Sequence, residues 1–535
     1  MKMKIKLAFF RTLFSQSAAS LTMSRLASVI RDDLGLEVDL CLLEKGDLHN
    51  LDTLVEKNKD YNILIAKPNF KDFQVMFNYL ACLKKIKIFD KIFLCGPFAS
   101  LNSKSLLRAN CWLDGVIKYP IEVNALQIIY KLSRDRGFRL KGERRLLRRA
   151  LAGQAISFAD LPRPARDIEK KEWGSYANLE FSWGCDYHCS FCHLPLLKKE
   201  GGAFAASRTP QSVIEEVAFL QHGLNKNFFI FNDSCFWRSA YDNDRITEFC
   251  RKIKQKKLKV HFYIYLRCRP FIGEDNIKKL SAAGLVRVFV GLESFSGRDQ
   301  EAYDKVIEEN NFIRIKKILD KYKINVHIGF IVFSPYSTLR DVAKNIRYLD
   351  SIGHLFRIGV ILEPVRLIPG SNLQKKLAAD GLLSNKSDYK DVSYGYIFKN
   401  KSTGRCLEFL KSTFGAEDLK SVVYEFEYFC TTMGLIYSLL MKDGERHFDM
   451  IKSDYYDFYT LKKQGEKVLK KYLLYVVGRF GSGRSVEPSE TEAFREAFIR
   501  SSLLLKIKYS LIKSIIARSK DRSILSEVYS GRENL

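Results

Sequence analysis

Short β-branched segments alternate with amphipathic segments along most of the chain, and this alternation constrains the fold more than any other feature. In the first 130 residues, five runs are typical of strands, and Leu21 to Leu34 has helical periodicity. The runs are Ile5 to Phe10, Glu37 to Leu43, Tyr61 to Ala66, Lys91 to Leu94 and Gly115 to Lys118. Five such units predict a Rossmann-like α/β domain over residues 1–133, with a parallel sheet that has helices on both faces.

The segment from about Lys131 to Gly174 breaks this alternation. It is basic and then polar, with a cluster of cations at 134–149 and the sequence Leu-Pro-Arg-Pro at 161–164. Prolines interrupt periodic structure and favour an extended connection. We therefore expect a linker over residues 134–170.

A second alternating series follows, with helical patterns such as Ser212 to Gly223 between its strands. Its predicted strands are Tyr176 to Ser182, Asn227 to Phe231, Lys259 to Tyr265, Val286 to Val290, Asn325 to Phe333 and Ile358 to Pro364. Six βα units fit a partial (β/α)6 barrel over residues 171–377. The active site of such a barrel lies at the carboxyl ends of the strands.

The pattern after Leu377 is mainly helical, which predicts a helical C-terminal domain over residues 378–535. A Gly-Ser-rich break stands at 481–483, and a long amphipathic run extends from Glu492 to Lys520. We interpret the apolar side of that run as core and docking face.

Three cysteines, Cys185, Cys189 and Cys192, fall within eight residues directly after the first strand of the second series. Thiolates at this spacing can surround one metal centre, and a loop at a barrel mouth leaves that centre open to a ligand. A structural zinc is the competing interpretation, with His188 or His193 as the fourth ligand. The remaining cysteines are scattered, which indicates a reducing compartment, and we expect a cytoplasmic protein.

The charge and hydropathy of the chain limit its partners. Arg11 interrupts the first apolar run, so we interpret the start of the chain as a strand and not as a signal peptide. No run approaches the roughly 18 to 20 apolar residues that cross a bilayer. The formal charge of +27 would suit a nucleic acid, an anionic membrane surface or an acidic substrate, and a lysine-rich solvated surface explains it equally well.

The spacing Cys-x3-Cys-x2-Cys, with Phe191 before the third cysteine, resembles the signature of the radical S-adenosylmethionine (SAM) superfamily. In that family three cysteines bind three irons of a 4Fe-4S cluster, and the fourth iron chelates the amino and carboxylate groups of SAM. One electron then releases a 5′-deoxyadenosyl radical. The resemblance implies that Cys185, Cys189 and Cys192 are the metal ligands. The missing fourth cysteine agrees with an open coordination position.

Further segments resemble the family's motifs, in the family's order. Asn232 to Phe236 resembles the segment that contacts the methionine amino group, and Arg267 stands where related enzymes often place an arginine near the cofactor. Gly291 to Ser294 resembles Gly-x-Glu-Ser, Gly329 to Ser334 the segment near adenine, and Pro369 to Leu373 the closing Pro-Gly-Thr-Pro-Leu. The resemblance implies SAM-binding roles for six residues: Phe191, Asn232, Asp233, Arg267, Glu293 and Ser334.

The first domain resembles the cobalamin-binding domain that precedes the barrel in one subgroup, which includes C- and P-methyltransferases. Cys95-Gly96-Pro97-Phe98-Ala99 looks like that domain's Gly-Gly-Pro-His-Ala, where glycine lets the backbone approach the corrin tail. Cys95 and Phe98 depart from this pattern, and the Asp-x-His-x-x-Gly that supplies an axial histidine is absent after the first strand. The resemblance implies cobalamin near Gly96 and Pro97, without axial histidine ligation.

Together these resemblances imply a cobalamin-dependent radical SAM methyltransferase that acts on an unactivated centre. The alternatives are a radical SAM cyclase or oxidoreductase without methyl transfer, a tRNA methylthiotransferase and a non-catalytic metal-binding protein. The positive charge favours the tRNA enzyme, but Cys41, Cys82, Cys95 and Cys111 are too dispersed for the second cluster that such enzymes carry. We expect a small-molecule or peptide substrate, an electron donor such as flavodoxin or ferredoxin, no nucleic acid partner and no membrane span.

Overall fold

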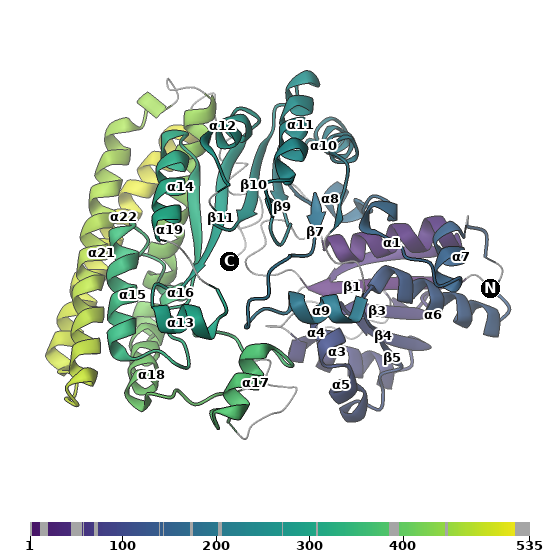
Figure 1. Ribbon diagram of the computed structural model, residues 1–535, viewed down its shortest axis with the longest axis horizontal. Helices are drawn as coiled ribbons and strands as arrows, with labels where there is room; N and C mark the ends of the chain where they lie inside the picture. The colour runs from purple at the N-terminus through teal and green to yellow at the C-terminus, as the bar shows by residue number, and fades with distance from the viewer. Residues whose placement is uncertain are drawn as a thin grey trace.

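Two parallel sheets and a layer of long helices follow one another along the chain in the computed structural model (Figure 1). In Figure 1 the N-terminal sheet lies at the right, the second sheet in the middle and the C-terminal helices at the left. The structure describes residues 3–10, 20–43, 56, 58–68, 73–138, 140–142, 144–171, 175–201, 206–269, 271–305, 309–384, 395–443 and 448–518.

The first sheet has five parallel strands in the order β2-β1-β3-β4-β5, which confirms the predicted domain fold. The strands are β1 (Lys4–Phe10), β2 (Glu37–Leu43), β3 (Ile63–Lys67), β4 (Lys91–Cys95) and β5 (Gly115–Ile117). One face packs on α1 (Leu21–Leu34) and α6 (Ile121–Asp135), and the other on α3 (Phe73–Lys85), α4 (Gly96–Leu101) and α5 (Ser103–Ala109). Strand β2 is added on one side of β1, and β3 to β5 are added on the other side. Sheets with such a switch point bind ligands there, at the carboxyl ends of the strands.

The segment for which we predict a linker holds the helices α7 (Arg145–Leu151) and α8 (Asp167–Lys171) and packs against both of its neighbours. The Asp33 carboxylate at the end of α1 accepts hydrogen bonds from the amides of Leu146 and Leu147, at 2.9 and 2.6 Å. These bonds satisfy the N-terminus of α7.

The second sheet has five parallel strands in the order β12-β11-β10-β9-β6. They are β6 (Tyr176–Leu179), β9 (Phe228–Phe231), β10 (His261–Leu266), β11 (Leu285–Glu293) and β12 (Asn325–Phe330). The helices between them include α10 (Pro210–Leu224), α11 (Asp242–Gln255), α12 (Glu274–Ala282), α13 (Gly297–Ala302), α14 (Glu309–Lys321) and α15 (Leu339–Ser351). A short antiparallel pair, β7 (Ser182–Trp183) and β8 (Ala206–Ser207), follows β6. Five of the six strands predicted for this series are confirmed.

The sixth prediction, a strand at Ile358 to Pro364, is wrong, because the segment begins as the helix α16 (Ile358–Leu362). The Glu427 carboxylate accepts hydrogen bonds from the Gly359 amide at 2.9 Å and from Arg357 Nε at 2.8 Å. A carboxylate at the first turn stabilises a helix N-terminus. Glu427 is far from this segment in the sequence. The local sequence alone is a β-branched run, and it therefore predicts a strand.

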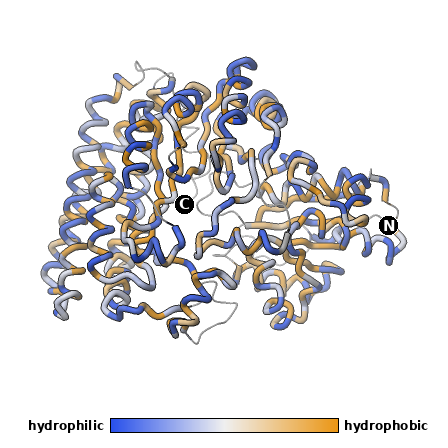
Figure 2. The backbone as a smooth tube through the Cα atoms, in the orientation of Figure 1, coloured by the Kyte–Doolittle hydropathy of each residue, from blue (hydrophilic) through white to orange (hydrophobic). Residues whose placement is uncertain are grey.

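The C-terminal region is helical, as predicted, with α18 (Lys401–Gly415), α19 (Glu417–Asp443), α21 (Lys452–Gly481) and α22 (Pro488–Arg518). Helix α19 packs on β11 and β12, and Arg287 Nη2 of β11 donates to the Thr431 carbonyl at 2.8 Å. Figure 2 shows the strands largely in orange, while the outer helices at the left alternate between blue and orange. Among the described residues, no helix is long and apolar enough to cross a membrane.

Candidate functional site

The three cysteines lie on a loop that leads from β7 to α9 (Leu194–Gly201). Gly184 precedes them with φ +83°, a conformation that glycine adopts readily. The Cys192 amide donates to the Cys189 carbonyl at 3.0 Å, which closes a tight turn. Ser190 anchors this turn. Its amide donates to the Tyr303 carbonyl at 2.9 Å, and its hydroxyl donates to the Ala302 carbonyl at 2.6 Å. Its own carbonyl accepts from the Leu373 amide at 2.9 Å.

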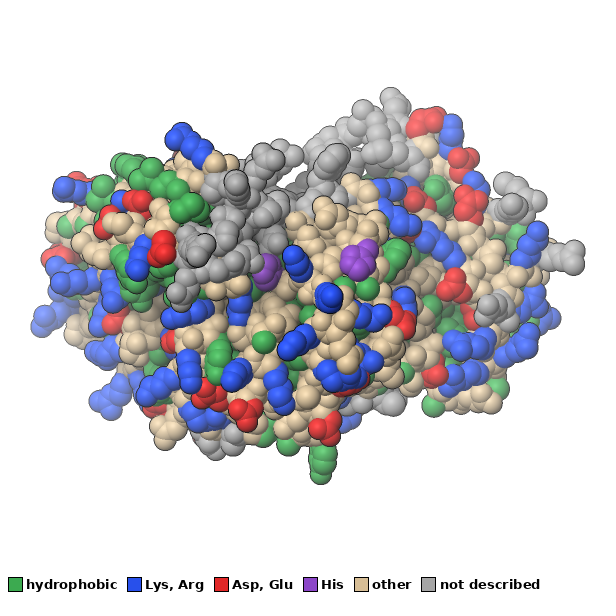
Figure 3. Space-filling view, turned by 90° about the horizontal axis from the view of Figure 1, so that it is seen from above, with side chains coloured by type: hydrophobic (Ala, Val, Ile, Leu, Met, Phe, Trp, Pro, Cys, Tyr) green, Lys and Arg blue, Asp and Glu red, His purple; other side chains and the backbone are tan. Residues whose placement is uncertain are grey.

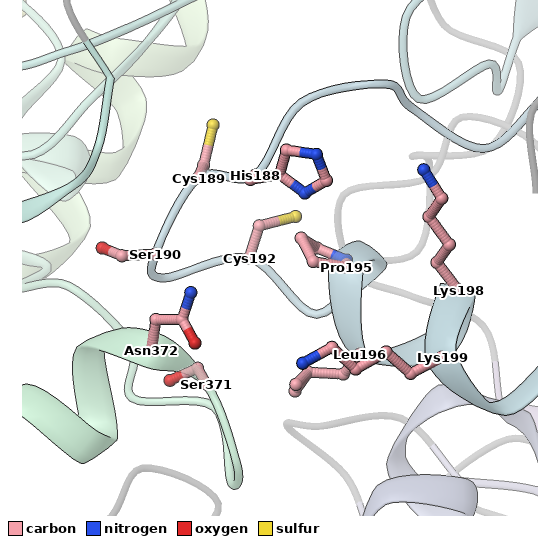
Figure 4. Close-up of a pocket in the computed structure, with 10 residues that line it drawn as sticks. All are labelled: His188, Cys189, Ser190, Cys192, Pro195, Leu196, Lys198, Lys199, Ser371 and Asn372. Atoms are coloured by element: carbon pink, nitrogen blue, oxygen red, sulfur yellow. The ribbon is translucent and has the colours of Figure 1, made fainter.

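Cys189 and Cys192 line a pocket of about 340 Å³ (Figure 4). The cysteine loop forms one side of the pocket, α9 the opposite side, and the start of α17 (Asn372–Ala379) lies below. The other lining residues are His188, Ser190, Pro195, Leu196, Lys198, Lys199, Ser371 and Asn372. The structure therefore places two of the predicted metal ligands beside a space that a cofactor can enter.

The three thiols share one electrostatic environment. Burial, together with the smaller effect of the nearby charges of Cys189 and Cys185, raises the pKa of Cys192 to about 11. Burial also raises the pKa of Cys185, and Cys189 again contributes. A metal that binds here must therefore displace protons. In the part of the chain that the structure describes, no group of three or more His, Cys, Asp or Glu is placed to hold one metal ion.

Arg267 follows β10 and points at the cysteine loop. Its Nη1 donates a hydrogen bond to Cys189 Sγ at 3.0 Å. Its guanidinium also lies 3.8 Å from the ring centroid of Tyr187, over which Arg269 lies at 4.2 Å. A cationic donor to a thiolate stabilises the negative charge of the sulfur. Arg267 thus contacts a predicted metal ligand directly.

Asn232 and Asp233, predicted as neighbours in the SAM site, point in different directions. The buried Asp233 carboxylate accepts from the amides of Phe181 and Ser182, at 2.9 and 2.5 Å, and from the Ser182 hydroxyl. Burial raises the pKa of Asp233 to about 6. Asp233 therefore holds the chain between β6 and β7, whereas the Asn232 side chain is exposed just beyond the carboxyl end of β9.

Glu293 ends β11 with φ +63° and forms an ion pair with Lys305, at 2.6 Å between Oε1 and Nζ. The pair lies over Gly291, since a Cβ built on that glycine would stand 2.7 Å from Glu293 Oε1 and 3.0 Å from Lys305 Nζ. Lys305 is buried, and its charge lowers the pKa of Cys192 against the stronger effect of burial. The ion pair therefore lies close to the cysteine loop. Sequence reasoning missed Lys305, because an isolated lysine after a short helix carries no recognisable signal.

Ser334 and Phe191 make only internal contacts among the described residues. Ser334 is fully buried, its amide donates to the Ser337 hydroxyl at 3.0 Å, and its own hydroxyl accepts from the Tyr336 amide at 3.3 Å. The Phe191 ring packs edge-on against Tyr303, with centroids 5.2 Å apart. Both side chains therefore contribute to packing within the protein.

The carboxyl end of the first sheet faces the cysteine loop across a buried seam. Arg25 of α1 pairs with Glu122 of α6 at 3.3 Å and also with Glu180, which follows β6. The Trp183 ring stacks on Tyr119, with centroids 5.6 Å apart. Because α9 also packs on α4, the structure brings Gly96 and Pro97 to the side of the seam that the cysteine loop occupies.

Gly96 has φ +95°, and the three atoms nearest to a Cβ built there belong to the Lys67 side chain, the nearest at 3.0 Å. Lys67 ends β3 and donates to the Ser20 hydroxyl at 3.0 Å. Burial lowers the pKa of this lysine. The nearest contact on this side of Gly96 is therefore a flexible side chain, which an incoming ligand can displace.

Comparisons with known proteins agree with this architecture. The profile of the radical SAM superfamily matches residues 179–349. An uncharacterized methyltransferase of Pyrococcus horikoshii is 22% identical over 394 residues, 71% of this chain and 83% of that protein. The structure of the cobalamin-dependent S-adenosylmethionine radical enzyme OxsB with aqua-cobalamin bound has a TM-score of 0.64 at 16% identity, over 98% of this chain and 83% of that one.

A second solved structure has the same fold over a smaller part of the chain. It is the radical S-adenosylmethionine methyltransferase TsrM of Kitasatospora setae with cobalamin and a 4Fe-4S cluster bound. Its TM-score is 0.53 at 15% identity, over 72% of this chain and 81% of that one. The match to OxsB extends over 98% of this chain, so the predicted mixed α/β fold with parallel sheets and a mainly helical C-terminal region is confirmed.

Proposed function

This chain is a radical SAM enzyme, and from that premise we propose that it is a cobalamin-dependent methyltransferase that acts on an unactivated centre. The observation that carries the proposal is that the three-cysteine loop of the second sheet lies opposite the carboxyl end of the first sheet. We also propose the domain limits 1–133, 134–170, 171–377 and 378–535.

The donor set on the cysteine loop fits a 4Fe-4S cluster. Cys185, Cys189 and Cys192 are partly exposed free thiols on one loop. In such a cluster each thiolate binds a different iron, so the three sulfurs need not converge on one point. When bound, the cluster supplies an electron to SAM, whose cleavage yields the 5′-deoxyadenosyl radical. Ser190 holds the loop in place, and reduced flavodoxin or ferredoxin is the proposed electron donor.

The residues around the mouth fit the polar end of SAM. The methionine part of SAM carries an ammonium and a carboxylate. The Glu293–Lys305 pair, beside the cysteine loop, offers a carboxylate for the ammonium and an ammonium for the carboxylate. We assign Glu293 to the ammonium and Lys305 to the carboxylate, with Asn232 as a further polar contact at the mouth. We assign Asp233, Ser334 and Phe191 to positioning these elements, because their described contacts are internal.

Lys305→Met is expected to weaken SAM binding roughly ten- to hundredfold, because a charged hydrogen bond contributes about 1.5 to 3 kcal/mol. The measurement is the dissociation constant of SAM, by calorimetry on the reconstituted enzyme. Lys321→Met is the matched control, since Lys321 forms an exposed ion pair with Glu274. Equal affinities for the two variants would contradict the assigned role of Lys305.

Arg267→Met is expected to make the cluster harder to reduce. The guanidinium donates to Cys189 Sγ and favours the more negative, reduced state, since hydrogen bonds to sulfur raise the reduction potential of Fe–S clusters. A redox titration followed by electron paramagnetic resonance measures the midpoint potential. Arg269→Met is the control, because Arg269 lies over the same Tyr187 ring. If both variants shift the potential equally, the Arg267 hydrogen bond does not tune the cluster.

The edge of the first sheet fits cobalamin at one described position. The Lys67 side chain lies nearest to the Cβ position of Gly96, and Pro97 stands in the first turn of α4. Residues 11–19 and 44–55, which follow β1 and β2, lie outside the described residues. When bound, methylcobalamin supplies the methyl group. Absorbance titration with hydroxocobalamin tests binding without any substrate.

The function is tested by incubating the reconstituted enzyme and a reductant with SAM that carries a deuterated methyl group. A small-molecule or peptide product that gains one labelled methyl in place of hydrogen is the expected result. Release of 5′-deoxyadenosine with a product of unchanged carbon count would instead favour a cyclase or an oxidoreductase of the same fold.

A further inference from the structure

The outer face of α22 carries a stripe of large aliphatic side chains. Leu503, Leu504, Ile507 and Leu511 are 56%, 44%, 59% and 46% exposed. Their spacing of three and four residues places them on one side of the helix over about two turns. The opposite side is the packed one, where Phe498, Leu505, Tyr509, Ile512 and Ile516 are buried against α19 and α21. We call these four exposed residues the α22 stripe.

Other exposed apolar side chains lie on the neighbouring helices. Tyr424 of α19 and Tyr456 of α21 are 52% and 56% exposed, and Tyr459 of α21 is 41% exposed. Helices α21 and α22 run antiparallel, since Lys508 pairs with Asp454 near the start of α21 and Thr491 hydrogen-bonds to Tyr472 nearer its end. In Figure 3, exposed hydrophobic side chains gather among lysines and arginines at the left end of the molecule, the end where the C-terminal helices lie.

The charged residues of α22 that flank the α22 stripe all have one sign. Residues 497–518 contain five basic residues and no Asp or Glu: Arg500, Lys506, Lys508, Lys513 and Arg518. Lys506 and Lys508 pair with acidic residues of α19 and α21. The pair of Lys506 with Glu425 is exposed and such pairs are weak, so Lys506 can exchange its partner for another anion.

We propose that the outer face of α22 docks on an anionic lipid bilayer. The α22 stripe enters the boundary between headgroups and acyl chains, and the surrounding lysines and arginines meet lipid phosphates. An amphipathic helix with a basic polar face and bulky aliphatic residues has the composition of a helix that lies in the membrane interface. The chain's formal charge of +27 strengthens the attraction to a negative surface.

A second copy of the chain fits this face less well. A two-fold contact would bring α22 against α22 and oppose the same basic residues, which repel one another. A bilayer supplies both an apolar layer and negative charge. In Figure 1, α22 lies at the left and the first domain at the right, so docking through α22 does not cover the first domain.

Vesicle flotation of the full chain tests the proposal. The chain is expected to float with vesicles of phosphatidylcholine and phosphatidylglycerol and to stay at the bottom with phosphatidylcholine alone. The double variant Leu503→Ser/Ile507→Ser is expected to bind at least about tenfold more weakly, since it removes two inserting side chains. The double variant Leu107→Ser/Ile313→Ser is the control, because Leu107 and Ile313 are exposed aliphatic residues on α5 and α14.

Two results would overturn the proposal. One is an equal affinity of wild type and the α22 double variant for the charged vesicles. The other is a concentration-dependent dimer, detected by light scattering, that the α22 substitutions abolish, because the stripe would then serve a second copy. Circular dichroism of both double variants verifies that they are folded, and raised salt should weaken binding of the wild type.

Discussion

Replacing Cys185, Cys189 or Cys192 by serine is expected to reduce SAM cleavage to the background rate and to remove most of the bound iron. Each thiolate holds a different iron, so losing one leaves the cluster without enough protein ligands. Serine keeps the size of the side chain, and the Ser190 bonds that anchor the loop remain. The measurement is 5′-deoxyadenosine formed under reducing, anaerobic conditions, together with iron per chain.

Cys235 provides the informative control. It is buried, donates to the Trp237 carbonyl at 3.3 Å, and lies close enough to Cys185 for that charge to raise its pKa, after the larger effect of burial. Cys235→Ala is expected to keep iron and activity, because the proposal requires an open fourth iron. Cys250→Ala, on α11, controls for loss of a buried thiol elsewhere. Iron loss in Cys235→Ala alone would mean that a fourth protein ligand closes the site.

Arg166→Met is expected to lower the free energy of unfolding by about 3 to 5 kcal/mol, because it leaves uncompensated buried charge. Arg166 pairs with Glu169 and with Glu216, and all three side chains are at most 4% exposed. Its Nη1 also donates to the Asn178 carbonyl of β6 at 2.9 Å. The pair with Glu216 ties the segment before the barrel to α10, and Arg208 adds a second cation to Glu216.

The matched control is Arg163→Met, three residues away. Arg163 pairs with Glu215, and both side chains are more than 40% exposed, so a change of about 0 to 1 kcal/mol is expected. Urea denaturation, followed by circular dichroism, measures both variants. Similar losses in the two would show that burial of the Arg166 network contributes nothing.

Local patterns predict the strands well in this chain. In both series a β-branched run is buried within a parallel sheet, and the amphipathic stretch after it covers one face, so periodicity and final structure agree. The run at Ile358 to Pro364 fails because Glu427, far away in the sequence, caps it as a helix. A contact of this kind leaves no trace in the local sequence.

The candidate site could be predicted only where the chemistry is local. The three cysteines are recognised by their spacing, whereas Lys305 reaches the site through its tertiary contact with Glu293 and belongs to no recognised motif. The reverse holds for Asp233, which lies in a motif, yet its carboxylate binds the chain between β6 and β7. A motif identifies a segment, and only the folded chain shows which side chain faces the ligand.

The central claim is that the three cysteines hold a 4Fe-4S cluster with one iron left for SAM. Electron paramagnetic resonance of the reduced, reconstituted enzyme with and without SAM tests it most directly. We predict about four irons per chain and a cluster signal that changes when SAM is added, as expected for direct ligation. A chain that instead holds one zinc, or a cluster signal that SAM leaves unchanged, would contradict the claim.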